Sequence, residues 1–172
     1  HDASGFHLHV VAGNARREQN ARIIGVIDDS MILPPGKASW THSFNVPSSE
    51  LTHILAKDHE LHPTINVVAM HLHAHDTCTR MTVFNEHRND TRGQFVMYDI
   101  DPYGGYGGDQ SFLFTTKDVR LDAGDMLSVS CTFDTSGKSK ETRSGMGIMD
   151  EMCGPLMVIS PVDPSALLDS FI

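Results

Sequence analysis

Apolar and polar positions alternate with a period of two along much of this sequence. Residues 38–46 and 127–133 are clear examples. Because successive side chains of a β-strand point to opposite faces, this alternation predicts strands with one face against a core. The predicted strands cover residues 6–11, 21–33, 38–46, 65–75, 79–85, 94–100, 111–115, 127–133 and 156–159, and the acidic pair Asp28-Asp29 is expected to break the second of them.

Glycine, proline and small polar residues separate these strands. Pro34-Pro35-Gly36 is a turn signal, and residues 101–109 are glycine-rich. We expect the glycine-rich segment to contribute nothing to the core, and we interpret it as a hairpin tip rather than a lid. Only a short helix is expected, at residues 51–55. The fold class is therefore all-β, an antiparallel β-sandwich or barrel, and residues 1–172 are expected to form a single domain.

The predicted strand at residues 65–75 ends in a His-x-His-x-His motif. In a strand, His71, His73 and His75 share one face. The opposite face is apolar and should be the core face; it consists of Val68, Met70, Leu72 and Ala74. The imidazoles should then point away from the core, where three neighbouring nitrogen donors are well suited to hold a metal ion.

Composition narrows the choice of metal and partner. The chain of 172 residues has a formal net charge of -9, which argues against nucleic acid or an anionic membrane as the main partner. No apolar run approaches the roughly 18 residues of a membrane span. Eleven histidines and nine methionines are many for this length, and copper accepts both as ligands.

Other readings of the histidines are also open. Zinc is one, and cupin-type iron or manganese sites also begin with His-x-His on a strand. A cupin needs a glutamate a few residues downstream of the motif, whereas the first glutamate after His75 is Glu86. Histidines on a polar strand face without any metal are a further alternative. A polar strand face without metal is the favoured interpretation of the second His-x-His pair, His7 and His9.

Three cysteines are present: Cys78, Cys131 and Cys153. By strand phase Cys131 faces inward. A Cys131–Cys153 disulfide would bury Cys153, turn Met152 outward to the histidine side, and stabilise the fold by roughly 3 kcal/mol. Two buried free thiols are an equal alternative from spacing alone. Cys78 is left over, either free or as a weak candidate for a soft ligand.

Several of these features occur together and in the same order in the C-terminal catalytic domain of the copper type II, ascorbate-dependent monooxygenases. The sequence therefore resembles that domain. This family includes peptidylglycine α-hydroxylating monooxygenase and dopamine β-monooxygenase. The resemblance covers residues from about 4 to 161. It is carried by Ile24-Gly25 with Ile32 to Gly36, His71-Leu72-His73, Ala123 to Leu127, Cys131-Thr132-Phe133, Gly145 to Gly147, and Asp150-Glu151-Met152-Cys153.

The resemblance implies a jelly-roll-like β-sandwich with an oxygen-binding copper centre. It implies His71, His73 and Met152 as the ligands of one copper ion, and a Cys131–Cys153 disulfide. It also implies O₂ as a substrate, ascorbate as the reductant and hydroxylation of a substrate C–H bond. His75 has no ligand role in the family pattern and is either a neighbour of the site or a third nitrogen ligand.

Two departures from the family pattern matter. Family enzymes carry a second, electron-transferring copper in an N-terminal domain, and this sequence contains only the second domain. In the peptide-amidating branch, an arginine, an asparagine and a tyrosine help bind the substrate carboxylate. Their positions here hold Ala69, Gly154 and Leu156, so a peptidylglycine substrate is not expected.

The leading hypothesis is therefore the oxygen-activating domain of a copper monooxygenase that acts on an unidentified small-molecule or peptide substrate. The runner-up is a copper protein for storage, delivery or electron transfer, and a third reading is a binding module without metal. A disulfide and the Asn89-Asp90-Thr91 sequon favour a secreted, periplasmic or vesicle-lumen location. No signal peptide is visible, and we expect that a leader preceded His1.

Overall fold

The structure is a computed structural model that describes residues 21–52, 64–87, 93–105, 113–122 and 124–160. The predicted strand at 6–11, with His7 and His9, and the sequon at 89–91 lie outside the described residues. In chain order the described elements are β1 (Arg22–Gly25), β2 (Ile32–Leu33), β3 (Trp40–Pro47), α1 (Ser48–Thr52), β4 (Ile65–Ala74), β5 (Cys78–His87), β6 (Gly93–Ile100), β7 (Leu113–Leu121), β8 (Met126–Phe133), β9 (Thr142–Arg143) and β10 (Cys153–Ser160).

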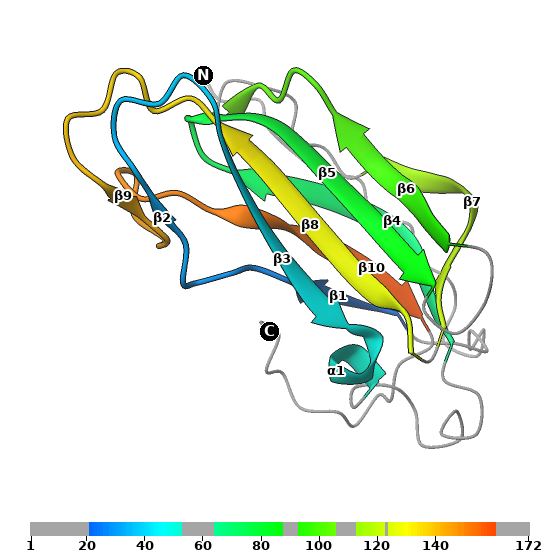
Figure 1. Ribbon diagram of the computed structural model, residues 1–172. Helices are drawn as coiled ribbons and strands as arrows, with labels where there is room; N and C mark the ends of the chain where they lie inside the picture. Colours follow the sequence, from blue (N-terminus) through cyan, green and yellow to red (C-terminus); the bar gives the residue numbers. More distant parts are fainter. Residues whose placement is uncertain (1–20, 53–63, 88–92, 106–112, 123, 161–172) are drawn as a thin grey trace, which may run out of the picture.

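Two four-stranded antiparallel sheets stack face to face, as Figure 1 shows. One sheet has the strand order β1-β10-β4-β7, and the other has the order β3-β8-β5-β6. A small two-stranded sheet, β2-β9, extends from one end of the sandwich. The prediction of an all-β, antiparallel β-sandwich is confirmed. No helix in the described part of the chain is long and apolar enough to cross a membrane.

The core lies between the two sheets and follows the predicted alternation most closely in β8. There Leu127, Val129, Cys131 and Phe133 are fully buried, and the residues between them are half-buried. Burying each large apolar side chain stabilises the fold by roughly 1.5–3 kcal/mol. This face of β8 therefore accounts for why the strand lies at the centre of its sheet, between β3 and β5.

Some predicted boundaries and connections were wrong. β7 runs from Leu113 to Leu121 and is much longer than the predicted strand at 111–115. β6 and β7 belong to different sheets, so the glycine-rich segment between them crosses from one sheet to the other and is not a hairpin tip. The predicted strand at 21–33 is interrupted around Asp28-Asp29, as expected, but its two parts, β1 and β2, lie in separate sheets. These errors concern which strands pair, which local alternation does not encode.

Candidate metal centre

The histidine motif lies at the C-terminal end of β4, a strand held between β10 and β7. Met70, Leu72 and Ala74 are buried, and His71 and His73 between them are half-buried, as the alternation predicted. Val68 was expected on the core face but is 41% exposed. The reason is a β-bulge, because the registers of β4 with both β10 and β7 shift between Val67 and Ala69.

The three imidazoles form one contiguous cluster. The rings of His71 and His73 stack with centroids 5.8 Å apart, and the rings of His73 and His75 meet edge-on at 5.4 Å. His75 follows the last residue of β4 and is only 3% exposed, whereas His71 and His73 are half-buried. The chain turns at this point, and the strand alternation no longer fixes the direction of the side chain.

His75 is oriented by a hydrogen bond to the segment that carries Met152. Its ring Nδ1 lies 2.8 Å from the carbonyl oxygen of Asp150. Because a carbonyl oxygen only accepts, Nδ1 carries the proton and donates it. In the neutral imidazole the lone pair then resides on Nε2. The hydrogen bond therefore fixes both the ring orientation and the tautomer of His75.

Strand pairing places Met152 beside the histidines. Cys153 is opposite Ala74 and Gly154 is opposite His73 in the register of β10 with β4. Cys153 faces the core, so by alternation Met152, one residue before it, falls on the histidine side of the sheet. Its side chain is 7% exposed and is therefore covered.

A disulfide joins Cys131 of β8 to Cys153 of β10, with the two Cα atoms 6.0 Å apart. It confirms the pairing that the family resemblance implied. The bond links the two sheets of the sandwich directly beside Met152, because β8 and β10 belong to different sheets. Closing a loop over this sequence separation of 22 residues stabilises the fold by about 3 kcal/mol in the chain-entropy model.

Glu151 is the residue of this end that sequence reasoning missed. Its side chain is 1% exposed and accepts four hydrogen bonds. Oε2 accepts from the backbone N–H groups of His75 at 2.8 Å and Met152 at 3.0 Å, while Oε1 accepts from the N–H and hydroxyl of Thr77 at 2.7 and 2.8 Å. One carboxylate thus ties the chain after β4 to the residue before β10. The only sequence signal was a glutamate directly before Met152.

Tyr103 supports the end of β4 from the glycine-rich segment. Its side chain is 6% exposed, and its hydroxyl accepts from the N–H of Ala74 at 2.9 Å and lies 3.1 Å from the carbonyl oxygen of Leu72. The expectation that this segment contributes nothing to the core was therefore wrong. Gly105 has φ +57, and a Cβ there would lie 3.1 Å from the Cα of Asp76, so this position requires glycine.

Cys78 is not placed as a metal ligand. It is 2% exposed and belongs to the core cluster. Burial, reinforced by the nearby Glu151 carboxylate, raises the pKa of the Cys78 thiol to about 12. Since thiolates rather than thiols bind metals, this side chain is a poor ligand at neutral pH.

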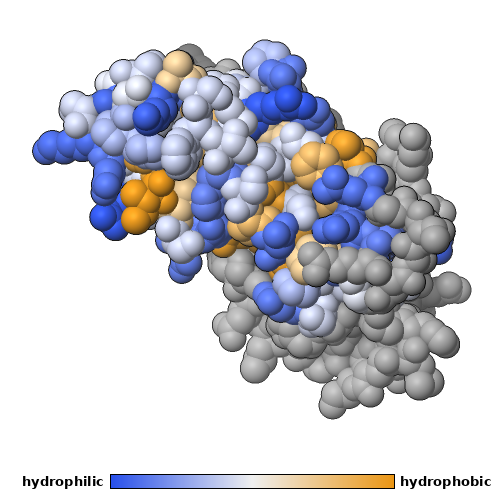
Figure 2. Space-filling model, in the orientation of Figure 1, coloured by the Kyte–Doolittle hydropathy of each residue, from blue (hydrophilic) through white to orange (hydrophobic). Residues whose placement is uncertain are grey.

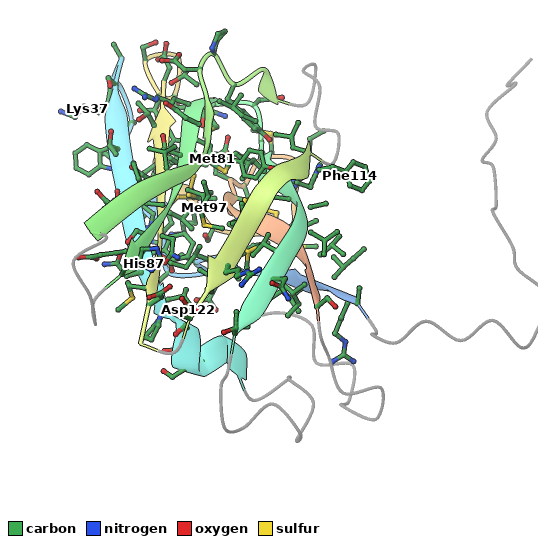
Figure 3. The ribbon with its side chains drawn as sticks, turned by 90° about the vertical axis from the view of Figure 1, so that its right-hand side faces the viewer. Lys37, Met81, His87, Met97, Phe114 and Asp122 are labelled. Atoms are coloured by element: carbon green, nitrogen blue, oxygen red, sulfur yellow. A yellow bond between two sulfur atoms is a disulfide. The ribbon has the colours of Figure 1, made fainter. Side chains whose placement is uncertain are left out.

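A second group of polar side chains lies at the opposite end of the sandwich, near α1 (Figure 3). Ligand atoms of His87, Asp122 and Asp125 lie within 4.8 Å of one another. The Asp125 carboxylate is 3% exposed and already accepts hydrogen bonds from the Asn85 amide at 3.0 Å and the Asp122 N–H at 2.9 Å. Its Oδ2 also lies 2.9 Å from Nδ1 of His87. Three contacts within the protein thus converge on Oδ2 of Asp125, and we interpret the group as a structural network.

The fold and the candidate ligands now define a class: a β-sandwich with a histidine pair on one strand and a methionine directly before the neighbouring strand. The family model for the C-terminal domain of copper type II ascorbate-dependent monooxygenases matches residues 20–159. The chain belongs to this family.

Two similar relatives agree with this assignment. Tyramine beta-hydroxylase of Caenorhabditis briggsae is 28% identical over 154 residues, and dopamine beta-hydroxylase of Equus caballus is 26% identical over 153 residues. Each match covers 88% of this chain and 24% of the relative. The chain thus spans about a quarter of the length of these relatives.

Proposed function

We propose that this chain is the oxygen-binding copper domain of a monooxygenase, with His71, His73 and Met152 as ligands of one copper ion. The family is copper- and ascorbate-dependent, and residues 20–159 match its C-terminal domain. The observation that carries the proposal is the register of β10 with β4, in which Gly154 lies opposite His73 and so brings Met152 to the histidine end. Two imidazoles and one neutral thioether form a donor set that suits Cu(I).

The surrounding residues support this role by holding the donors in place. Glu151 fixes the backbone at both His75 and Met152, and the disulfide at Cys153 anchors the next residue to the other sheet. We propose His75 as a positioning residue. Its ring meets that of His73 edge-on, and its Nδ1 is committed to the Asp150 carbonyl. Rigid support of this kind limits rearrangement of the donors when a ligand binds.

Three protein ligands leave a coordination position open for a small molecule. When bound, copper supplies the one-electron reduction of O₂ and hydrogen abstraction from a substrate C–H bond; with two electrons from ascorbate, the net products are a C–OH group and water. The second electron-transferring copper of this family would come from a domain N-terminal to this one. The chain's span of about a quarter of its relatives is consistent with such a partner. The disulfide supports an oxidising compartment, such as a secretory vesicle or the exterior of the cell.

A peptidylglycine substrate is disfavoured by the packing around Gly154. A Cβ built at this position would overlap the carbonyl oxygen of Val26, which belongs to the segment following β1. The asparagine of the peptide-amidating branch therefore has no room here unless the backbone at Val26 moves. We propose a substrate that does not depend on this asparagine to bind a carboxylate group. This is in keeping with the relatives named for tyramine and dopamine hydroxylation.

The test is an anaerobic titration with Cu(I) and Cu(II), followed by X-ray absorption on the Cu(I) form. We expect one tightly bound copper per chain with nitrogen and sulfur neighbours, and loss of the sulfur contribution in Met152→Leu. Met81→Leu is the matched control, because Met81 is a fully buried core methionine on β5 of the other sheet (Figure 3). Volume-conserving exchanges of this kind cost less than about 1.5 kcal/mol of stability.

Two outcomes would contradict the proposal. A nitrogen-only shell, unchanged in Met152→Leu, would point to a site made by His71, His73 and His75 alone. Failure of the wild-type protein to bind stoichiometric copper would leave a β-sandwich without a metal function. If copper binds as expected, turnover with ascorbate and a copper-loaded electron-transfer domain separates a monooxygenase from a copper storage or delivery protein.

A further inference from the structure

The loop between β9 and β10 exposes three large apolar side chains. Met146, Ile148 and Met149 are 81%, 79% and 73% exposed, which places them among the most exposed hydrophobic residues of the described chain. Figure 2 shows apolar surface interrupting the otherwise hydrophilic end of the molecule that carries β2 and β9. Side chains of this size are seldom presented together in water unless they contact a ligand or a partner.

The loop has a defined shape. Its base is closed by a hydrogen bond from the N–H of Gly145 to the carbonyl of Glu151, at 3.1 Å. Its tip is closed by two bonds between Gly147 and Asp150, one from the Asp150 N–H to the Gly147 carbonyl at 2.9 Å and one from the Gly147 N–H to the Asp150 carboxylate at 3.0 Å. The exposed side chains are therefore held on a closed turn.

The same loop is attached to the proposed copper centre. The carbonyl of Asp150 accepts the hydrogen bond from the His75 ring, and Glu151 binds the backbone of both His75 and Met152. The C-terminal side of the loop, at Asp150 and Glu151, is thus bonded directly to residues of the proposed centre.

Methionines recur at every third position along this segment, as Met146, Met149 and Met152. Their exposure falls from 81% to 73% and then to 7%. The exposure of these methionines therefore decreases along the sequence toward Met152, the proposed ligand. Met149 also lines an open hollow of about 490 Å³ together with residues 137–143, so the loop can be approached from outside. Thioethers are soft, neutral and flexible donors, which favours Cu(I) over hard divalent ions.

From this series we propose that Met146 and Met149 form a surface site that captures Cu(I) and passes it to the centre at Met152. This inference rests on the proposed copper function. The transfer is a ligand exchange in which the ion stays Cu(I), each thioether stays neutral, and no electron or proton moves. A surface that only docked an apolar partner would need exposed hydrophobic side chains but not sulfur. Here two of the three exposed side chains are methionines, and a third methionine, Met152, follows at the same spacing.

The experiment follows Cu(I) transfer from a coloured cuprous chelate under anaerobic conditions and measures the equilibrium affinity by competition. In the double variant Met146→Leu/Met149→Leu we expect transfer to slow by about tenfold, which corresponds to roughly 1.4 kcal/mol on the barrier. The affinity of the centre should stay within about twofold, or roughly 0.4 kcal/mol. X-ray absorption with a second equivalent of Cu(I) should show a sulfur-rich site in the wild type that the double variant lacks.

Ile148→Ala is the matched control, because it removes exposed apolar surface from the same turn but no sulfur. It should load copper at the wild-type rate. Equal slowing in Ile148→Ala and the double variant would overturn the inference in favour of apolar docking, as would unchanged loading in the double variant. Those results leave the proposed function intact when Met152→Leu still removes sulfur from the centre. Absence of copper binding in the wild type would instead overturn the proposed function itself.

Discussion

The two ends of the sandwich each contain buried carboxylates and histidine, yet they are built for different purposes. One end, which we call the donor end, holds His71, His73, His75, Glu151 and Met152. The other, which we call the carboxylate end, holds Asn85, His87, Asp122 and Asp125. β5 spans the distance between them with ten residues, or roughly 30 Å at about 3.3 Å per residue.

The difference lies in what each buried carboxylate binds. Asp125 accepts from the amide of Asn85 and the N–H of Asp122, and its Oδ2 lies 2.9 Å from Nδ1 of His87, so this carboxylate contacts an imidazole directly. Glu151 instead accepts from three backbone N–H groups and one hydroxyl. The Asp125 carboxylate thus contacts side chains and backbone of its own end, whereas the Glu151 carboxylate holds the backbone at His75 and Met152. This difference supports the proposal that the copper ligands lie at the donor end.

The largest effect is expected from Glu151→Ala. Removing this carboxylate leaves four buried or half-buried donors to find new partners, and unsatisfied buried groups cost about 1–3 kcal/mol each. We expect a loss of about 4 kcal/mol in the free energy of unfolding, measured by urea denaturation, together with weaker Cu(I) binding. A variant that unfolds at the wild-type urea concentration would show that the loop and β4 are held together by other contacts.

Asp125→Ala is the matched change at the carboxylate end. It removes the acceptor of two hydrogen bonds and the carboxylate that lies 2.9 Å from His87 Nδ1. Unsatisfied buried groups cost about 1–3 kcal/mol each, so we expect a loss of about 3 kcal/mol in the free energy of unfolding. Urea denaturation should show this loss, whereas the affinity for Cu(I), measured below the unfolding transition, should match that of the wild type. A fall in copper affinity as large as that in Glu151→Ala would mean that the two ends are coupled through the fold.

The sequence was sufficient for the parts of this comparison that depend on local alternation. The buried face of β8 and the placement of His71 and His73 opposite Met70 and Leu72 followed from strand periodicity. The pairing of Cys131 with Cys153 needed the family resemblance, because spacing alone fitted two free thiols equally well. The ligand assignment itself stays a prediction.

What the sequence did not reveal depends on contacts between distant segments. The exposure of Val68 results from a bulge that exists only in the pairing of β4 with its neighbours. The role of Glu151 depends on backbone groups 74 and 76 residues away. Tyr103 was overlooked because its glycine-rich surroundings indicated a surface loop, while its hydroxyl meets the end of β4.

Gly154→Asn tests how closely the donor end is packed. The Cβ position of Gly154 overlaps the backbone of Val26, whose N–H donates to the Pro155 carbonyl at 3.0 Å. Backbone cannot move aside as a flexible side chain would, so we expect a loss of about 2–3 kcal/mol in the free energy of unfolding, typical of overpacking. Gly137→Asn is the control, because a Cβ at Gly137 has no heavy atom within 4 Å. Equal stability of the two variants would show that the segment after β1 moves freely.

The smallest effect concerns Cys78, the soft side chain at the donor end that we exclude as a ligand. Burial raises the pKa of its thiol to about 12 in the folded protein, above the ordinary value of 9.0. Between these two values the unfolded chain releases the thiol proton while the folded chain retains it, so the stability from this group falls as the pH rises. We expect a loss of about 2 kcal/mol between pH 9 and pH 10.5 that is missing in Cys78→Ala, measured by urea denaturation at each pH. Parallel pH profiles for the two proteins would indicate a thiol that ionises normally, and would return Cys78 to the candidate ligands beside Met152.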